Sequence, residues 1–241
     1  MPVMKVGPGR ALLGGGGNYN DLVMGTGPIA YWPQSESSGL TAYCLTNPAM
    51  NGTYTGVTLA NDLTGPFGTP APYFDGLNDY CTLTTAPLLA ALNPSVGTAA
   101  IWTRVANVGV WTDGVEHHAW TAYRSLNNRM WHSKRAANNN IQTIHIGNGA
   151  LVVIPNAGHA ETAWVHWAMS WNAGGNLITY VNGIQDGAAT PGVTAWTGAP
   201  IAVYIGSNYL VPNALWYGWL GPLAFWNRIL PQPEIATLAL T

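Results

Sequence analysis

The clearest pattern along the chain is an alternation of apolar and polar positions over residues 164–171, which read Trp-Val-His-Trp-Ala-Met-Ser-Trp. Successive side chains of a β-strand point to opposite faces, so a period of two predicts a half-buried strand here. The residues predicted to share one face are Val165, Trp167, Met169 and Trp171. A Gly- and Asn-rich turn over residues 172–176 comes next.

A second β-branched and aromatic run follows over residues 177–181 and ends at Asn182-Gly183. Asn-Gly is the strongest short hairpin signal because both residues accept a positive φ. Residues 164–181 and the segment after Gly183 are therefore predicted to form a three-stranded meander.

The same pattern of short apolar runs separated by turn residues recurs elsewhere along the chain. Residues 73–83 place a Gly and Asn/Asp turn cluster between two short apolar runs, which predicts a hairpin. Residues 203–207 and 216–226 are typical of strands, and residues 230–238, with early prolines, predict a short final helix.

Several short motifs occur in one fixed order between residues 28 and 239. They are Ala30–Pro33 with Glu36, Asn51–Tyr54, Phe74–Gly76 with Asp79–Tyr80, Ala100–Trp102, Trp164–Ala168, Tyr180–Gly183, Ile205–Gly206 with Gly218, Asn227–Arg228 and Glu234–Ile235. In this ordered set the chain resembles a laminin-G-like domain of the concanavalin A-like lectin and glucanase superfamily. The resemblance implies an all-β jelly-roll sandwich of two antiparallel sheets, with a short C-terminal helix, and it implies no particular activity.

The N-terminal stretch differs from the rest of the chain. Residues 14–17 are four consecutive glycines, whose backbone entropy opposes regular structure. We predict an extended glycine-rich arm over residues 1–20 and one jelly-roll domain over residues 21–241. The arm is expected either to become ordered along a neighbouring subunit or to be a plain disordered terminus.

The sequence lacks recognisable targeting segments, which favours a protein that is carried on a virion or another extracellular particle. Residues 1–10 lack the apolar core of a signal peptide, and no segment reaches the length of a membrane span. The lead-in over residues 19–32 resembles that of laminin-G-like units in bacteriophage tail and capsid-surface proteins. We therefore expect synthesis in the cytoplasm without a signal peptide, no membrane partner, and a location on a virion or extracellular particle surface.

Charge is scarce: 7% of the residues are Asp, Glu, Lys or Arg, against roughly 25% in a typical soluble domain. With a net charge of −2, such a surface favours association, which predicts a homo-oligomer or contacts with other virion or assembly subunits. The alternative is that the low charge reflects only evolutionary drift toward a polar, uncharged surface in a β-rich secreted protein, with no assembly implied. Nucleic acid is excluded as a partner because the basic residues form no stripe, and the short cluster Arg124, Arg129, Lys134 and Arg135 is interpreted as a solvated loop.

Sugar rings stack on exposed aromatic rings while amides bind their hydroxyls, so aromatics close to Asn or Gln are candidates for contact with a cell-surface glycan. The candidate carbohydrate-binding residues are Trp111, Trp120, Tyr123, Trp131, Asn138, Tyr209, Trp216 and Tyr217. A two-sheet core or an oligomer interface would use the same residue types.

Hard cations prefer oxygen ligands, and Asp75, Asn78 and Asp79 place three such side chains in one loop. A Ca²⁺ site is therefore possible there, although one loop supplies only part of a shell and Asp75 could instead cap its own turn. No other cofactor is expected.

Cys44 and Cys81 could pair across strands or could each be a buried small hydrophobe. Synthesis in the cytosol favours the second interpretation.

Retaining glycosidase chemistry needs two carboxyl groups about 5 Å apart. The resemblance implies that one strand supplies them as Glu-x-Asp-x-x-Glu or a variant of that pattern. The four glutamates match no such strand, and Asp113 with Glu116 is interpreted as a solvated pair in a turn. We therefore predict no catalytic residues. The expected function is that of a non-enzymatic virion surface component that contacts glycans, and a lectin-like carbohydrate-binding module without activity is the alternative.

Overall fold

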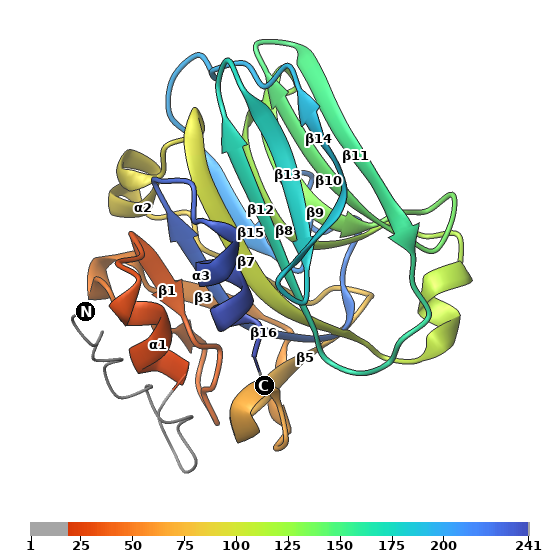
Figure 1. Ribbon diagram of the computed structural model, residues 1–241. Coiled ribbons are helices and arrows are strands. Elements are labelled where there is room, and N and C mark those ends of the chain that lie inside the picture. Colours follow the sequence, from red (N-terminus) through yellow and green to blue (C-terminus); the bar gives the residue numbers. More distant parts are fainter. Residues whose placement is uncertain (1–18, 241) are drawn as a thin grey trace, which may run out of the picture.

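Two antiparallel sheets of eight strands each face one another in the computed structural model, which describes residues 19–240 and, among them, leaves aside the side chains of residues 155–157 (Figure 1). This architecture confirms the predicted all-β jelly-roll sandwich. Sheet A contains, in spatial order, β14 (Ile184–Pro191), β13 (Asn176–Val181), β12 (Val165–Asn172), β7 (Val96–Val105), β16 (Tyr217–Trp226), β5 (Ala71–Asp75) and β4 (Thr58–Asp62), with β1 (Ala30–Trp32) also paired to β16.

Sheet B forms the other layer. Its strands, in spatial order, are β11 (Ala150–Gly158), β10 (Asn140–Gly147), β9 (Asn128–Lys134), β8 (His117–Ser125), β15 (Ala202–Ile205), β6 (Tyr80–Thr82), β3 (Gly52–Thr55) and β2 (Thr41–Ala42). The helices are α1 (Tyr19–Gly25), α2 (Ala86–Ala91) and α3 (Gln232–Leu238), with short 3₁₀ turns η1 (Pro48–Met50), η2 (Pro66–Gly68) and η3 (Val108–Thr112).

The predicted meander is confirmed, since β12, β13 and β14 are neighbours in sheet A. Asn182 and Gly183 take φ values of 49° and 78°, so both residues of the β13–β14 turn are left-handed. This is the backbone that favours Asn-Gly in a two-residue hairpin.

The predicted hairpin over residues 73–83 is wrong. β5 pairs with β16 in sheet A, whereas β6 pairs with β15 and β3 in sheet B. The turn between them carries the chain from one sheet to the other. A cluster of turn residues specifies a reversal of direction but not that the flanking strands pair with each other.

β12 is not half-buried as predicted, because both of its faces are covered. Trp167 and Met169 point into the core between the sheets, and Ala168 on the opposite face is equally buried. That face packs against Val23 of α1 and Ile235 of α3, which lies in front of sheet A in Figure 1. The expected final helix is thereby confirmed as α3, and it covers part of the outer face of sheet A.

The first described residues belong to the domain rather than to an arm. Tyr19 and Asn20, expected to lie in the arm, begin α1, and the Tyr19 ring stacks on Phe67 with centroids 3.9 Å apart. The Tyr19 hydroxyl also accepts a hydrogen bond from Trp102 at 3.0 Å. The remainder of the predicted arm, residues 1–18, lies outside the described residues.

Cys44 and Cys81 are both free thiols and both buried. Each contributes to the main hydrophobic cluster between the sheets. Of the two alternatives, the structure therefore supports small buried hydrophobes.

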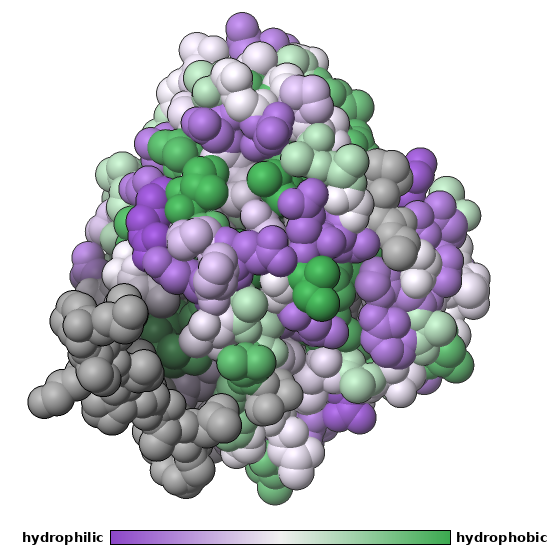
Figure 2. Space-filling model, viewed as in Figure 1, coloured by the Kyte–Doolittle hydropathy of each residue, from purple (hydrophilic) through white to green (hydrophobic). Residues whose placement is uncertain are grey.

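The face that carries α3 mixes hydrophilic and hydrophobic residues in small interleaved patches (Figure 2). With 18 ionisable Asp, Glu, Lys and Arg side chains from eight basic and ten acidic residues in the whole chain, neutral amides and hydroxyls contribute much of its polarity. A surface of this kind has little long-range electrostatic repulsion.

Candidate functional site

Three of the eight predicted sugar-binding residues are core residues. Trp120, Trp216 and Trp111 keep 0%, 1% and 2% of their surface exposed, inside the cluster between the sheets. Trp120 packs edge-on against Phe225, and Trp216 packs against Trp167. Their assignment to a binding surface is therefore corrected. Strand alternation turns Trp120 of β8 into the sandwich, whereas Trp111 enters it from the turn η3 and Trp216 from the residue before β16.

Tyr123, Trp131 and Tyr209 are brought together on the outer face of sheet B, where the two tyrosines are half-buried and Trp131 keeps only 8% of its surface exposed. Tyr123 on β8 lies directly opposite Arg129 on β9, and Trp131 follows two residues later on the same face. The Tyr209 ring stacks on Tyr123 with centroids 4.4 Å apart and an interplanar angle of 5°. Arg129 lies between Tyr209 and Trp131. We name the four residues Tyr123, Arg129, Trp131 and Tyr209 the sheet B aromatic surface.

Arg129 joins the rings of this surface. Its guanidinium carbon lies 5.1 Å from the centre of the Tyr209 ring and 5.4 Å from that of Trp131, and its Nη1 donates to the Tyr209 hydroxyl at 2.8 Å. Within residues 19–240 no carboxylate forms an ion pair with Arg129. The Arg129 guanidinium is therefore stabilised by cation–π contacts with Trp131 and Tyr209 rather than by an ion pair.

The loop between β15 and β16 delivers Tyr209. Asn208 accepts a hydrogen bond from the Leu210 N–H at 2.8 Å, and the Asn208 N–H donates to the Asn213 carbonyl at 3.0 Å. These bonds close the loop over sheet B on both sides of Tyr209, which places the ring against β8 although the two tyrosines are 86 positions apart in sequence.

The surface continues beyond Trp131 into a polar group. His118 stacks on Trp131 with centroids 5.4 Å apart, and its Nε2 lies 3.1 Å from Glu116. Ser133 donates to the same carboxylate at 3.0 Å. Burial favours a raised pKa for Glu116, but the hydrogen bonds and charge of His118, with the bond from Ser133, outweigh it and lower the pKa. Glu116 is thus an ionised, fixed acceptor.

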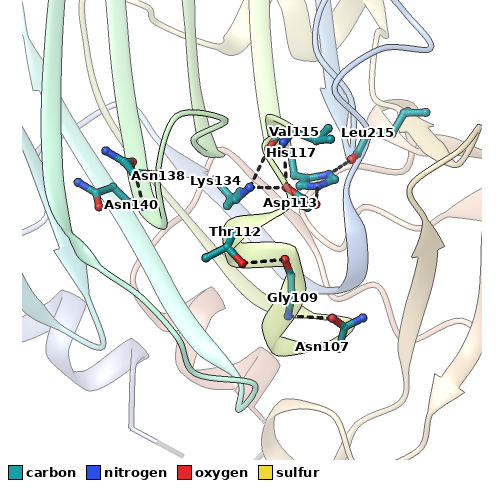
Figure 3. Close-up of polar contacts among 10 residues, drawn as sticks. All are labelled: Asn107, Gly109, Thr112, Asp113, Val115, His117, Lys134, Asn138, Asn140 and Leu215. Atoms are coloured by element: carbon teal, nitrogen blue, oxygen red, sulfur yellow. Dashed lines mark hydrogen bonds and ion pairs between the residues drawn. The ribbon is translucent and has the colours of Figure 1, made fainter.

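Tyr217 and Asn138 do not join this surface. Tyr217 lies on sheet A, opposite Asp75 on β5. Asn138 lies in the turn between β9 and β10, where its side chain accepts from the Asn140 N–H at 3.2 Å (Figure 3).

Asp113 holds a buried ion network, so the interpretation of Asp113 and Glu116 as a solvated pair is wrong. Lys134 is fully buried and donates to Asp113 at 2.6 Å and to the Val115 carbonyl at 2.8 Å (Figure 3). His117 places its Nε2 2.7 Å from Asp113 and its Nδ1 against the Leu215 carbonyl. Burial alone would raise the pKa of Asp113, but hydrogen bonds from Lys134 and His117 outweigh it and lower the pKa.

This network joins the turn after η3 to β8 and β9. Both ring nitrogens of His117 face protein oxygens, a carboxylate and a carbonyl. All partners of Lys134 are protein groups. The interpretation of Lys134 as part of a solvated basic loop is corrected, because its strand turns the side chain inward onto Asp113.

In the predicted Ca²⁺ loop, the carboxylate oxygens of Asp75 and Asp79 accept hydrogen bonds from backbone N–H groups of the same loop. Asp75 accepts from the N–H groups of Leu77 and Asn78 at 2.8 Å and 3.3 Å, and Asp79 accepts from the Asp75 N–H at 2.9 Å. Burial, opposed by that backbone bond, raises the pKa of Asp79. No group of three or more His, Cys, Asp or Glu side chains within residues 19–240 is arranged to hold a metal ion, and Ca²⁺ binding stays a prediction.

No helix within residues 19–240 is long and apolar enough to cross a membrane.

The fold and the aromatic surface define a lectin-like β-sandwich. A family model described as the concanavalin A-like lectin/glucanases superfamily matches residues 74–236, and the chain belongs to this family. The ordered motifs in the sequence, which imply this membership, are thereby supported. Comparison with curated proteins gives no match.

Solved structures share the fold. Domain 4 of AbnA, an extracellular arabinanase from Geobacillus stearothermophilus in complex with arabinotriose, is 15% identical with a TM-score of 0.65, covering 88% of this chain and 98% of that domain. Trypanosoma rangeli sialidase in complex with sialic acid is 13% identical with a TM-score of 0.65, covering 89% of this chain but 33% of the sialidase. The binding domain of botulinum neurotoxin serotype G is 12% identical with a TM-score of 0.65, covering 88% and 50%. At these identities the likeness shows the fold alone.

Sequence reasoning placed Arg129 in a solvated loop and so missed its role in the aromatic surface. The spacing Arg129-x-Trp131 inside an alternating run could have indicated that both side chains share one face of a strand.

Proposed function

We propose that the protein is a non-catalytic module that binds glycans through the sheet B aromatic surface. The observation that carries this proposal is the stack of Tyr123 and Tyr209 joined to Trp131 by Arg129. Sugars present apolar C–H faces to aromatic rings and hydroxyls to charged or amide donors, and this surface offers both on one side of a rigid sheet.

The donor capacity of Arg129 supports this function. One of its Nη atoms bonds to Tyr209, and within the described residues no carboxylate competes for the others. A guanidinium in a fixed fork favours paired oxygens, such as vicinal hydroxyls or a sugar carboxylate. The arabinotriose complex of the arabinanase domain with the same fold supports a saccharide ligand as well.

Absence of catalysis is part of the proposal, and the arrangement of the glutamates supports it. Glu36 accepts from Tyr43 and Tyr54, Glu161 from His159, and Glu234 from Arg228. Together with Glu116, each glutamate is held by protein partners, and none lies in the Glu-x-Asp-x-x-Glu pattern that the family resemblance implies for catalysis.

The test uses a set of neutral and acidic oligosaccharides followed by calorimetry on those that bind. Tyr209→Ala removes the outer ring of the stack and should weaken binding at least tenfold, since truncating an aromatic hot spot costs about 2 kcal/mol. Tyr209→Phe keeps the ring but loses the bond to Arg129, so it should fall between Tyr209→Ala and the unaltered protein.

Tyr43→Ala is the matched control. Tyr43 is also a surface tyrosine, with 55% of its area exposed, and it lies outside the sheet B aromatic surface. Equal affinities for the Tyr209→Ala and unaltered proteins, or release of reducing ends from any oligosaccharide, would refute the proposal.

We also propose that this module works as a component of a virion or similar particle surface, in contact with sister subunits. The charged fraction of 7% favours this, because so few like charges keep copies apart. Light scattering during size-exclusion chromatography should give a trimer or a larger assembly. A monomer that persists at high protein concentration would instead leave the isolated lectin-like module as the function.

A further inference from the structure

Sheet A carries a second aromatic cluster that the sequence analysis did not single out, apart from Tyr217. Tyr73 on β5 and Trp219 on β16 lie directly opposite one another, with ring centroids 5.0 Å apart. Tyr217 packs edge-on against Tyr73 at 6.4 Å. All three rings are half-buried, so each contributes area to the outer face of sheet A rather than to the core.

An ion pair fixes this cluster in place. The Arg104 guanidinium carbon lies 4.7 Å above the Trp219 ring, and its Nη1 donates to Asp62 at 2.7 Å. Asp62 also accepts from Trp164 at 3.3 Å and from Thr64 at 2.9 Å. Asp62 is therefore a positioning residue whose oxygens are already engaged, and it holds two large side chains at the edge of the surface.

The side-chain amide of Asn61 lies beside the Trp219 ring. Its Oδ1 accepts from Trp219 Nε1 at 2.9 Å, which orients the amide. The residue is exposed, and its amide nitrogen has no hydrogen-bond partner among residues 19–240. A donor beside a half-exposed indole is the pairing that a sugar ring requires, with the ring face on Trp219 and a hydroxyl on Asn61.

We propose that Tyr73, Trp219, Tyr217 and Asn61 form a second binding site, which takes neutral oligosaccharides. The charge of Arg104 is matched by Asp62, and Asp75 lies opposite Tyr217 on the neighbouring strand, so an acidic sugar meets no uncompensated cation. The site lies on the sheet opposite to the sheet B aromatic surface and does not depend on binding there. With both sites occupied, the module would link two glycan chains.

The probes are four neutral trisaccharides: arabinotriose, xylotriose, cellotriose and maltotriose. Nuclear magnetic resonance of the indole N–H groups of the intact chain should show the Trp219 signal shifting with at least one of them, with a Kd of about 1 mM, which is typical of a small contact surface. Trp219→Ala lacks this signal, so its affinity is measured by calorimetry and should be at least tenfold weaker. Tyr209→Ala should leave the Trp219 shift unchanged.

Asn61→Ala provides a variant with little risk to folding, because Asn61 is exposed. It should weaken binding about threefold to tenfold, as loss of one hydrogen bond does. The proposal is overturned if no trisaccharide shifts the Trp219 signal, if Asn61→Ala and Trp219→Ala bind as the unaltered protein does, or if Tyr209→Ala abolishes the Trp219 shift. The last outcome would retain the proposed function while removing the second site.

Discussion

At the scale of single residues, the large rings divide between two uses that sequence alone does not separate. Trp120 and Trp131 lie on neighbouring strands, yet the first fills the core between the sheets and the second packs against Ile144 in a small cluster on the outer face of sheet B, with 8% of its surface exposed. Alternation predicts that rings two apart share a face, but it does not say which face is the core when helices and loops cover the outer face as well. Tyr123, Trp131 and Tyr209 do lie close together, and their use in sugar binding stays a prediction, while Trp111, Trp120 and Trp216 lie in the core.

Removing Asp113 tests the buried ion network. Asp113→Ala leaves the buried Lys134 ammonium with only the Val115 carbonyl, and an uncompensated buried charge is costly. We expect the free energy of unfolding to fall by about 2–4 kcal/mol, toward the lower end because Asp113 is partly exposed. Urea unfolding at pH 7 measures this change.

Glu234→Gln is the control for that experiment. It breaks an ion pair with Arg228 in which both side chains are exposed, so the expected loss is below about 1 kcal/mol. Equal losses for the two variants would contradict a clamping role for Asp113.

The buried histidines predict how stability depends on pH. Burial lowers the pKa of His132 and of His166 to about 3, with the neighbouring His166 adding to the effect on His132. The unfolded chain binds these protons near pH 6.5, so the stability contributed is complete above that pH and is lost as the pH falls toward 3. Each group contributes a slope of up to about 1.4 kcal/mol per pH unit.

Unfolding free energies at pH 7, 6 and 5 test this dependence. The unaltered protein should lose stability steadily across the range, and His132→Gln should lose it less steeply, because one of the buried titrating groups is removed. His145, whose pKa is lowered chiefly by burial, contributes with the same sign. A stability that is constant between pH 7 and pH 5 would contradict the burial of neutral histidines.

At the scale of elements, the β13–β14 hairpin and α3 depend on one glycine. Gly183 has a φ of 78°, and a Cβ there would lie 2.5 Å from the Cα of Ala236 in α3. The turn therefore needs glycine for two reasons, its backbone conformation and the close approach of the helix. The Asn-Gly signal revealed the first reason, while the second depends on a helix more than 50 positions later in the chain.

Gly183→Ala should cost roughly 2–4 kcal/mol of unfolding free energy, combining left-handed strain with overpacking against α3. Gly174→Ala is a matched control, because Gly174 has the same φ of 78° but nothing among the described residues lies within 4 Å of its added Cβ. That variant should lose only about 1 kcal/mol. Equal losses in thermal or urea unfolding would show that α3 does not press on the turn.

At the scale of the whole molecule, local pattern predicted strands and the resemblance to a known family implied the class of fold, but local pattern did not predict how the sheets are assembled. The β12–β14 meander and the final helix follow from periodicity and turn residues. The passage from β5 to β6 does not, because pairing partners such as β16 and β15 come from more than 100 positions away. Two ring contacts of the proposed binding surfaces are also long-range: Tyr209 reaches Tyr123 from 86 positions away, and Trp219 lies opposite Tyr73 across the β16–β5 pair. Local pattern gives no signal of such contacts.

The most direct test of a glycan-binding face on sheet B follows the indole N–H signals during titration with the tightest-binding oligosaccharide. Trp131 lies in the sheet B aromatic surface, whereas Trp120 and Trp216 lie in the core. The account predicts that the Trp131 signal shifts in a saturable way, that the two core signals stay in place, and that Tyr209→Ala removes the shift. A saturable shift of other signals with Trp131 unmoved would contradict it.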